Sequence, residues 1–261
     1  MSIIRLAITG AGGRMGRALL AAATLDHHVA IAAALEHAAS PLIGTQVNGV
    51  TVSADLDAAL PNSDVLIDFT RPEGSMTHLA ACQRNGVNAV IGTTGFSDAD
   101  KRAIALFAES IAIVVAPNMS IGVNVTMKLV ELAAKSLGTD YDIEVFEAHH
   151  KMKVDAPSGT ALKLGEIAAL ARGQTLAEVG IYNRHGLEGA RKSGDIGFSV
   201  VRAGDIIGDH TVYFAGAGER IEITHKSSSR ENYAEGAMRA AKFLVNSKVG
   251  LFDMQDVLGL K

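Results

Sequence analysis

The sequence predicts an α/β protein: a Rossmann-like, doubly wound parallel sheet, followed by a second α+β domain that carries a mainly antiparallel, open sheet. Two observations support this fold class. In the first half of the chain, short runs of Val, Ile and Ala alternate with helix-like stretches, as in βαβ units. In the second half, strand-like segments with alternating apolar and polar residues are separated by Gly-rich turns, which favours antiparallel strands with one solvated face.

Five candidate strands in the first part of the chain are almost continuously apolar, as expected for parallel strands that helices cover on both faces. They are Ile3–Thr9, Val29–Leu35, Val65–Phe69, Ala89–Ile91 and Ile111–Ala116. The helix-like segments between them are Arg14–Thr24, Glu73–Asn85 and Asp98–Ser110. In a doubly wound sheet, ligands bind beyond the carboxyl ends of the strands.

From about Ser120 the pattern changes to mixed α+β. The candidate elements are a helix over Val123–Leu137, a strand over 141–150, a helix over Ala161–Ala171, three strands within 195–229, a helix over Tyr233–Val245 and an apolar tail over Leu251–Leu260. We therefore expect a dinucleotide-binding domain over residues 1–120 and a substrate-binding and tetramerisation domain over 121–229. Residues 230–261 are expected to form C-terminal helices that return to the first domain.

The composition favours some classes of protein over others. The 261 residues suffice for a sizeable core, and a net charge of -4 gives no support to general binding of nucleic acid or of a membrane surface. Cys82 is the single cysteine, so an internal disulfide is excluded and a reducing compartment fits. No apolar run approaches the ~18 residues of a membrane span, and no signal peptide is recognisable. We expect a cytoplasmic protein.

The segment "LAITGAGGRMGRALLAA" combines a strand, a glycine-dense turn and a helix. Gly10, Gly13 and Gly16 form a G-x-x-G-x-x-G variant of the dinucleotide-binding motif. Glycines allow a tight turn and a close approach of the backbone to a pyrophosphate, which the helix N-terminus attracts. A merely structural turn is the alternative. The candidate cofactor-binding residues of this loop are Gly10, Ala11, Gly12, Gly13, Arg14 and Met15.

Glu36 closes the second candidate strand, twenty residues beyond Gly16. An acidic residue at this place commonly binds the ribose hydroxyls of the cofactor, whereas a surface strand end without a role is the alternative. His37 follows, and no arginine that would pair with a 2′-phosphate is adjacent. The pattern therefore favours NADH, with NADPH left open through His37 and Arg14.

Two more loops follow predicted strands and are expected at the same edge of the sheet. They are "GTTGF" and "APNMS", and their small polar residues suit contact with the nicotinamide and its ribose. The candidate residues are Gly92, Thr93, Thr94, Ala116, Pro117, Asn118 and Met119.

The stretch "EAHHKMKVDAPSGTA" gathers two histidines and two lysines within five positions. Pro157 and Gly159 interrupt any helix there, so the segment reads as a strand end and a loop before a helix with Ser158 as its N-cap. Such a place can bind a carboxylate or phosphate, and histidine is the natural proton donor near neutral pH. A solvated charge patch and a metal site remain alternatives, although no metal-binding spacing is present.

At these residues the chain resembles the dihydrodipicolinate reductases, or 4-hydroxy-tetrahydrodipicolinate reductases, of bacterial lysine biosynthesis. The resemblance extends, in the order of the family, to "GAGGRMG", "DVLIDFTRPEG", "VIGTTGF", "APNMSIGVNV" and "RIEITHKSSSR". It implies a cytosolic homotetramer of two-domain subunits. NADH or NADPH would bind the first domain, and the second domain would contact the dicarboxylate substrate and, through its sheet, the other subunits.

The resemblance also implies the roles of residues. His149 would donate the proton and Lys153 would be its catalytic partner. The carboxylates of the substrate would be held by His150, Lys153, Gly159 and Thr160, and the candidate residues named above would line the cofactor. Two positions depart from the family. His37 replaces a common arginine, which leaves the cofactor preference open, and Met152 replaces a common histidine, which is therefore not required.

The mechanism that follows is hydride transfer to C4 of a cyclic imine dicarboxylate, with a proton added at C3 by His149 and charge stabilised by Lys153. Two rivals remain. An aldehyde-forming dehydrogenase with a cysteine nucleophile is disfavoured, since Cys82 falls inside a predicted helix. A non-catalytic NADH sensor would explain the glycine loop but leave His149 and Lys153 without a task.

Overall fold

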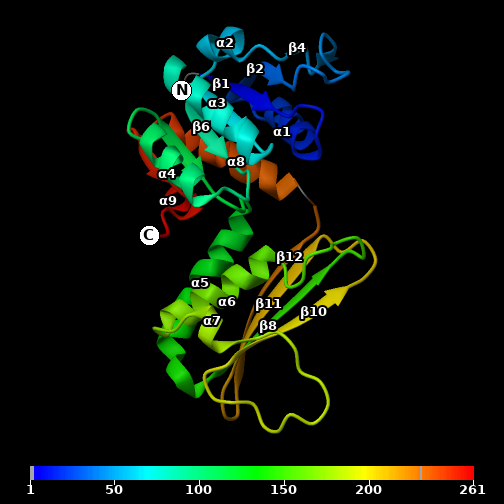
Figure 1. Ribbon diagram of the computed structural model, residues 1–261, viewed down its shortest axis with the longest axis vertical. Coiled ribbons are helices and arrows are strands. Elements are labelled where there is room, and N and C mark those ends of the chain that lie inside the picture. Colours follow the sequence, from blue (N-terminus) through cyan, green and yellow to red (C-terminus); the bar gives the residue numbers. More distant parts are fainter. Residues whose placement is uncertain (1–2, 230) are drawn as a thin grey trace. The chain divides into compact units, whose positions relative to one another are not determined.

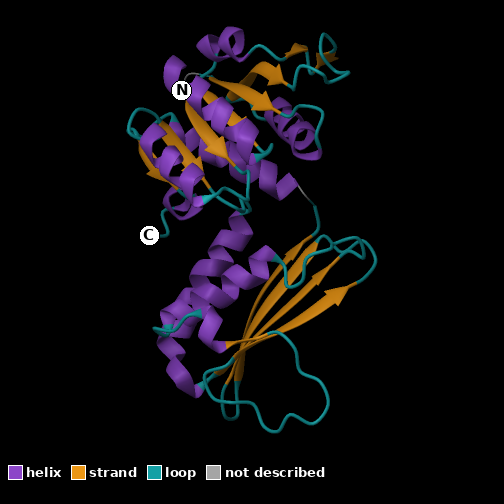
Figure 2. Cartoon of the chain, viewed as in Figure 1, coloured by secondary structure: helices purple, strands orange, loops and turns teal. Residues whose placement is uncertain are grey.

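The computed structural model of the protein describes residues 3–229 and 231–261, and it consists of two compact units. The first unit joins the chain up to Ile121 with Glu231–Lys261, and the second comprises the residues between them. Both expected boundaries, after residues 120 and 229, therefore lie one residue from the boundaries of the units. Figure 1 follows the chain through its helices and strands, and Figure 2 separates the two kinds of element by colour.

The first unit is built on an eight-stranded sheet with the order β13-β7-β6-β5-β1-β2-β4-β3. All neighbours are parallel except the short antiparallel pair of β3 and β4. The strands are β1 (Ile4–Thr9), β2 (Val29–Leu35), β3 (Gln46–Val47), β4 (Val50–Ser53), β5 (Val65–Asp68), β6 (Asn88–Ile91), β7 (Ala112–Val115) and β13 (Gly250–Phe252). The five predicted strands are present, and β3, β4 and β13 are additions that are too short for a sequence pattern to reveal.

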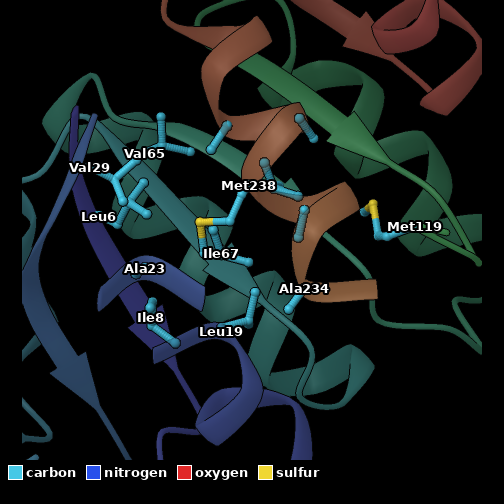
Figure 3. Packing of buried hydrophobic residues seen from close by; sticks show 14 of the residues in the cluster. Leu6, Ile8, Leu19, Ala23, Val29, Val65, Ile67, Met119, Ala234 and Met238 are labelled. Carbon is cyan, nitrogen blue, oxygen red and sulfur yellow. The ribbon is translucent and has the colours of Figure 1, made fainter. Parts of the chain in front are cut away.

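Helices cover both faces of this sheet, as the apolar strands predicted. One face packs against α1 (Arg14–Leu25), α8 (Glu231–Leu244) and α9 (Met254–Leu258), and the other against α3 (Pro72–Asn85) and α4 (Asp98–Phe107). In the first of these layers, Leu6 and Ile8 of β1 lie with Leu19 of α1 and Met238 of α8 (Figure 3). A short helix, α2 (Leu56–Ala59), and a 3₁₀ turn, η1 (Leu60–Asn62), precede β5.

The second unit has a five-stranded sheet with the order β12-β11-β8-β10-β9. Its strands are β8 (Asp142–His149), β9 (Gly180–Ile181), β10 (Ile196–Arg202), β11 (Gly208–Ala215) and β12 (Arg220–Ser227). Its helices are α5 (Ile121–Leu137), α6 (Gly159–Ala171) and α7 (Leu176–Val179), with a 3₁₀ turn η2 (Gly138–Asp140) after α5. The helices lie on one face of the sheet, where a single apolar cluster joins them to β8, β10 and β11 (Figure 1).

The pairing in this sheet is mixed. β11 pairs antiparallel with both β12 and β8, as the alternating pattern predicted, whereas β10 runs parallel to β8 and to β9. β8 therefore lies between β10 and β11, although these two strands follow each other in the chain. Local alternation reports that one face is buried, but it does not report which neighbour a strand selects. No helix in the described part of the chain is long and apolar enough to span a membrane.

Candidate active site

The glycine-rich loop connects β1 to α1 in the first unit. Gly10 has φ +63°, in the left-handed region that favours glycine. A Cβ at Gly16 would lie 2.0 Å from the carbonyl oxygen of Gly10, so only glycine lets α1 pack this closely on the turn. Gly13 is the N-cap, and no side chain within the described residues caps the helix there. The N–H groups of this first turn therefore point toward a place suited to a pyrophosphate.

Glu36 directly follows β2 and reaches back to the glycine loop. Its Oε1 accepts a hydrogen bond from the N–H of Gly12 at 2.8 Å, and its Oε2 accepts one from the N–H of His37 at 3.2 Å. The carboxylate thus lies beside the loop, where acidic residues of Rossmann folds meet the ribose hydroxyls. His37 itself is exposed, as is Arg14 at the start of α1.

A buried carboxylate to which the sequence analysis gave no role lies at the end of β5. Asp68 is fully buried, and its Oδ1 accepts hydrogen bonds from the N–H and the hydroxyl of Thr70, both at 2.7 Å. His78 of α3 contacts its Oδ2 at 2.7 Å, and Thr93 lies within 3.4 Å of its Oδ1. Burial raises the pKa of Asp68, but hydrogen bonds from His78 and Thr70 outweigh burial and lower it. An aspartate ending an apolar strand is the signal that could have indicated this group.

The two further loops lie after β6 and β7. At Gly92 a Cβ would clash with the ring of Phe69, which lies 2.1 Å from that position, so glycine is needed there. Ala116 and Met119 are buried in the core, and a Cβ at Gly236 of α8 would lie 1.8 Å from the carbonyl oxygen of Met119. The side chain of Met119 therefore serves packing (Figure 3), which leaves at most its backbone for a cofactor.

The carboxyl ends of parallel strands share one edge of a sheet, so the predicted cofactor residues gather there within the first unit. The group consists of Gly10–Met15 after β1, Glu36 and His37 after β2, Gly92–Thr94 after β6 and Ala116–Met119 after β7. The uncapped helix start, the glycines that admit close approach and the adjacent carboxylate fit a nicotinamide dinucleotide.

The histidine at the centre of the second unit's site ends β8. His149 is nearly buried, and its Nδ1 contacts Oε2 of Glu147 at 2.6 Å. Glu147 is fully buried and also accepts hydrogen bonds from both terminal nitrogens of Arg202 and from the N–H of Ser158. The ring of His210 on β11 meets the His149 ring edge to face, with centroids 5.1 Å apart.

The other cations of the stretch have different surroundings. Lys153 is largely buried and its Nζ forms an ion pair with Asp155 at 2.8 Å, which is the first cause of the lowered pKa of Asp155. The N–H of Lys153 donates to the carbonyl of His150, so these residues form a tight turn. Lys151 and Met152 are exposed. Because the groups differ so much in burial, the stretch is not a uniformly solvated face, and only Lys151 fits that alternative.

The predicted helix start is confirmed. Ser158 is the N-cap of α6, and its Oγ accepts a hydrogen bond from the N–H of Ala161 at 3.2 Å. Gly159 and Thr160 form the first turn, and the space beside the Cα of Gly159 is open. A carboxylate placed there would meet backbone N–H groups and the positive end of the helix dipole.

Two histidines that sequence analysis did not single out lie on the neighbouring strands. His210 is opposite Glu147 on β8 and opposite His225 on β12. Its Nε2 lies 3.1 Å from the hydroxyl of Ser158. Burial, followed by the nearby His149, lowers the pKa of His210 to about 4, so this ring is neutral near pH 7. A polar residue at a core-facing position of an alternating strand is the signal for it, as it is for Glu147. Within the described residues no cluster has the composition of a metal site.

These features define a class of protein. The first unit has the Rossmann-type sheet and loops of pyridine-nucleotide oxidoreductases, and the second holds a histidine, a lysine and a helix start suited to an anionic substrate. The comparisons place it more narrowly. The chain belongs to the dihydrodipicolinate reductase family, whose N-terminal model matches residues 4–119 and whose C-terminal model matches residues 122–258.

Relatives agree with this assignment over their whole length. The 4-hydroxy-tetrahydrodipicolinate reductase of Nitrosospira multiformis is 54% identical over 268 residues, and that of Laribacter hongkongensis is 57% identical over 268 residues, with 100% of both chains covered in each case. A dipicolinate-bound dihydrodipicolinate reductase from Paenisporosarcina sp. TG-14 is similar with a TM-score of 0.81 and 29% identity, covering 97% of this chain and 98% of that one. The protein is an oxidoreductase of this family.

Proposed function

We propose that the protein reduces 4-hydroxy-tetrahydrodipicolinate (dihydrodipicolinate) to tetrahydrodipicolinate with NADH or NADPH, in the diaminopimelate route of lysine biosynthesis. The observation that carries the proposal is the cluster in the second unit, where His149 and Lys153 stand beside the first turn of α6. The relatives that share the whole chain are named for this reaction, and a similar structure has dipicolinate, a planar dicarboxylate, bound.

The first unit supplies the cofactor site in this proposal. When bound, the reduced nicotinamide supplies the hydride. The first turn of α1 would hold the pyrophosphate, and the carboxylate of Glu36 would accept hydrogen bonds from the ribose hydroxyls. A 2′-phosphate would meet the negative charge of Glu36, and the adjacent His37 is exposed without an arginine beside it. We therefore favour NADH as the preferred cofactor.

The second unit would bind the two carboxylates of the substrate. One carboxylate would lie at the helix start formed by Gly159 and Thr160, where Ser158 fixes the geometry as N-cap. Lys153, with His150 in the same turn, would bind a carboxylate as well. The ion pair between Lys153 and Asp155 shows that the ammonium group already accepts an anionic partner. The substrate would exchange with this partly exposed aspartate.

Proton transfer is the part of the reaction that the residues themselves perform. Hydride addition at C4 leaves excess electron density at C3, and a proton from Nε2 of His149 would complete the reduction there. In the hydroxylated form of the substrate, the overall change also releases the C4 hydroxyl as water. Because the substrate becomes more electron-rich during the reaction, the charge of Lys153 stabilises the transition state more than the ground state.

Replacement of these two residues tests the roles. His149→Gln removes the proton donor and Lys153→Ala removes the ammonium charge, so each is expected to lower kcat at least ~10²-fold, the range for lost acid catalysis or charge stabilisation. The measurement is NADH oxidation with the condensation product of pyruvate and aspartate semialdehyde, repeated with NADPH to establish the preference. Circular dichroism controls for the fold.

The same assay separates the rival functions. Wild-type protein that binds NADH but does not oxidise it with this substrate would be a sensor, and the proposal would be wrong. Normal turnover in both variants would remove His149 and Lys153 from the mechanism. A cysteine nucleophile is already disfavoured, because burial, followed by the charge of Asp68, raises the pKa of Cys82 to about 12 and the thiol lies inside α3.

A further inference from the structure

Glu147 is a charged residue at a position that belongs to the core. It lies on the same face of β8 as Ile143 and Val145, both fully buried, and is itself fully buried. An unpaired carboxylate there would be costly, so its partners are informative. Oε1 accepts hydrogen bonds from the Ser158 N–H at 2.9 Å and from one terminal nitrogen of Arg202 at 2.8 Å. Oε2 contacts the other terminal nitrogen of Arg202 at 2.7 Å and Nδ1 of His149 at 2.6 Å.

These partners determine the charge of Glu147. Burial alone raises the pKa of the carboxyl group, but hydrogen bonds from Arg202, His149 and the Ser158 N–H outweigh it, and the pKa lies below its ordinary value. Near neutral pH the group is therefore a carboxylate, which can only accept hydrogen bonds. Since Oε2 accepts from His149, the proton on the neutral imidazole must be at Nδ1, and Nε2 is left for another partner.

The surroundings of Nε2 support this arrangement. The atom lies near Gly208 at the start of β11, where a Cβ would come within 3.1 Å of Nε2. Glycine at this position therefore keeps the space next to Nε2 open, while the Nδ1 side of the ring is occupied by Glu147. The ring has one side for a fixed partner and one side for a reacting molecule.

Arg202 connects the carboxylate to the loop that carries Lys153. It lies opposite His149 in the register of β10 and β8. Besides its two contacts with Glu147, its guanidinium donates to the carbonyl of Asp155 at 2.7 Å and to that of Val201 at 2.7 Å. One planar group thus fixes both oxygens of Glu147 and the backbone beside Lys153, a geometry that a lysine could not reproduce.

We propose that Glu147, held in place by Arg202, is a positioning residue for proton donation by His149. It fixes the Nδ1–H tautomer, orients the ring and stabilises the imidazolium form that carries the transferable proton on Nε2. In the step, the Nε2–H bond breaks, the proton adds to C3 of the reduced substrate and His149 is left neutral with its Nδ1–H, while Glu147 stays ionised. This role rests on the proposed function, and it parallels that of the buried aspartate in serine protease triads.

The variant Glu147→Gln separates this role from a merely structural ion pair. If the amide nitrogen took the place of Oε1, it would face two fixed donors, the Ser158 N–H and Arg202. In the place of Oε2 it faces one fixed donor, Arg202, and Nδ1 of His149, which can lose its proton. The second orientation is favoured, so the variant reverses the tautomer and places the neutral proton on Nε2.

The test combines spectroscopy and kinetics on the full chain. Nitrogen-15 NMR of the histidine rings, with His149 assigned by a His149→Gln sample, is expected to show Nδ1–H in the wild type and Nε2–H in Glu147→Gln at pH 8. In the NADH assay, Glu147→Gln is expected to lower kcat ~10²- to 10⁴-fold, the scale seen when the orienting carboxylate of a histidine is replaced by its amide. The alkaline limb of kcat should move to lower pH, because the imidazolium loses its anionic partner.

Asp64→Asn is the matched control. Asp64 also accepts hydrogen bonds from an arginine side chain, that of Arg5, and from a backbone N–H, but it lies in the first unit. It should leave the tautomer and the pH profile of kcat unchanged. An unchanged tautomer and pH profile in Glu147→Gln would overturn the positioning role. Full activity of His149→Gln would instead contradict the proposed function, whatever the tautomer.

Discussion

Three histidines lie next to one another across β8, β11 and β12. His149 and His210 have their rings in edge contact, and His210 is opposite His225. Burial lowers the pKa of both His210 and His225, and the shift is the larger for His210. Only His149 has a carboxylate partner among them in the printed geometry of the site, at Glu147. One site thus contains a histidine prepared to carry charge and another that is kept neutral.

The buried His210 predicts how stability depends on pH. The unfolded chain binds a proton at this residue near pH 6.5, but the folded chain binds it only near pH 4. Between these values the unfolded state holds more protons, so stability falls as the pH falls. The expected contribution is a loss of about 2 kcal/mol in the free energy of unfolding from pH 7 to pH 5.

Denaturant unfolding of the wild type and of His210→Gln at both pH values measures this contribution. The variant should lack about 2 kcal/mol of the wild-type difference. His27→Gln, which changes an exposed histidine in the first unit, is the control and should behave as the wild type. An equal pH dependence in all three proteins would show that His210 is protonated as readily in the folded chain as in the unfolded chain.

At the scale of elements, the contact between α1 and the turn before it joins packing to binding. A Cβ at Gly16 would lie 2.0 Å from the Gly10 carbonyl oxygen and 2.8 Å from the Cα of Ala11, so Gly16→Ala must push the helix away. Overpacking of this kind costs about 1–3 kcal/mol. Because the displaced helix start no longer meets the pyrophosphate, NADH affinity should fall at least ~10-fold, in addition to the loss of stability.

The control for this prediction is Ala21→Gly on the same helix. Ala21 is exposed, and glycine in a helix interior costs about 1 kcal/mol without touching the turn. Both variants should therefore lower Tm, but only Gly16→Ala should weaken NADH binding, measured by fluorescence titration. Equal NADH affinity in the two variants would contradict the cofactor site proposed for this loop.

At the scale of the whole molecule, we expect a homotetramer that forms through the open face of the second unit's sheet. Val201 of β10 is on that face, opposite Ala148 in the register, and is 37% exposed in the single chain. The expected mass by light scattering is four times 27.2 kDa. Val201→Asp should produce smaller species, because a charge on this face would be buried without a partner.

Leu132→Asp provides the comparison for the tetramer. Leu132 is an apolar residue on α5 with 61% exposure, away from the sheet face, so the substitution should leave the mass unchanged. Tetramers in both variants would mean that another surface joins the subunits. Smaller species in the wild type would contradict the proposed assembly itself.

The sequence by itself determined the elements that local patterns encode. Continuous apolar runs predicted the parallel strands, because both of their faces are buried, and Ser158 with Gly159 predicted the start of α6. The glycine loop was recognisable for the same reason: its spacing reflects a local backbone requirement at Gly10 and Gly16. The histidines and lysines of one short segment were visible together because a loop brings them together.

Only the tertiary structure decided which distant residues meet. Arg202 lies 55 positions from Glu147 in the chain, and His210 lies 52 positions from Ser158, yet each pair is in hydrogen-bond contact. These contacts depend on the insertion of β8 between β10 and β11, a choice of neighbour that alternation within a strand does not encode. The partner of Nδ1 on His149, and with it the side of the ring left for chemistry, follows from that pairing.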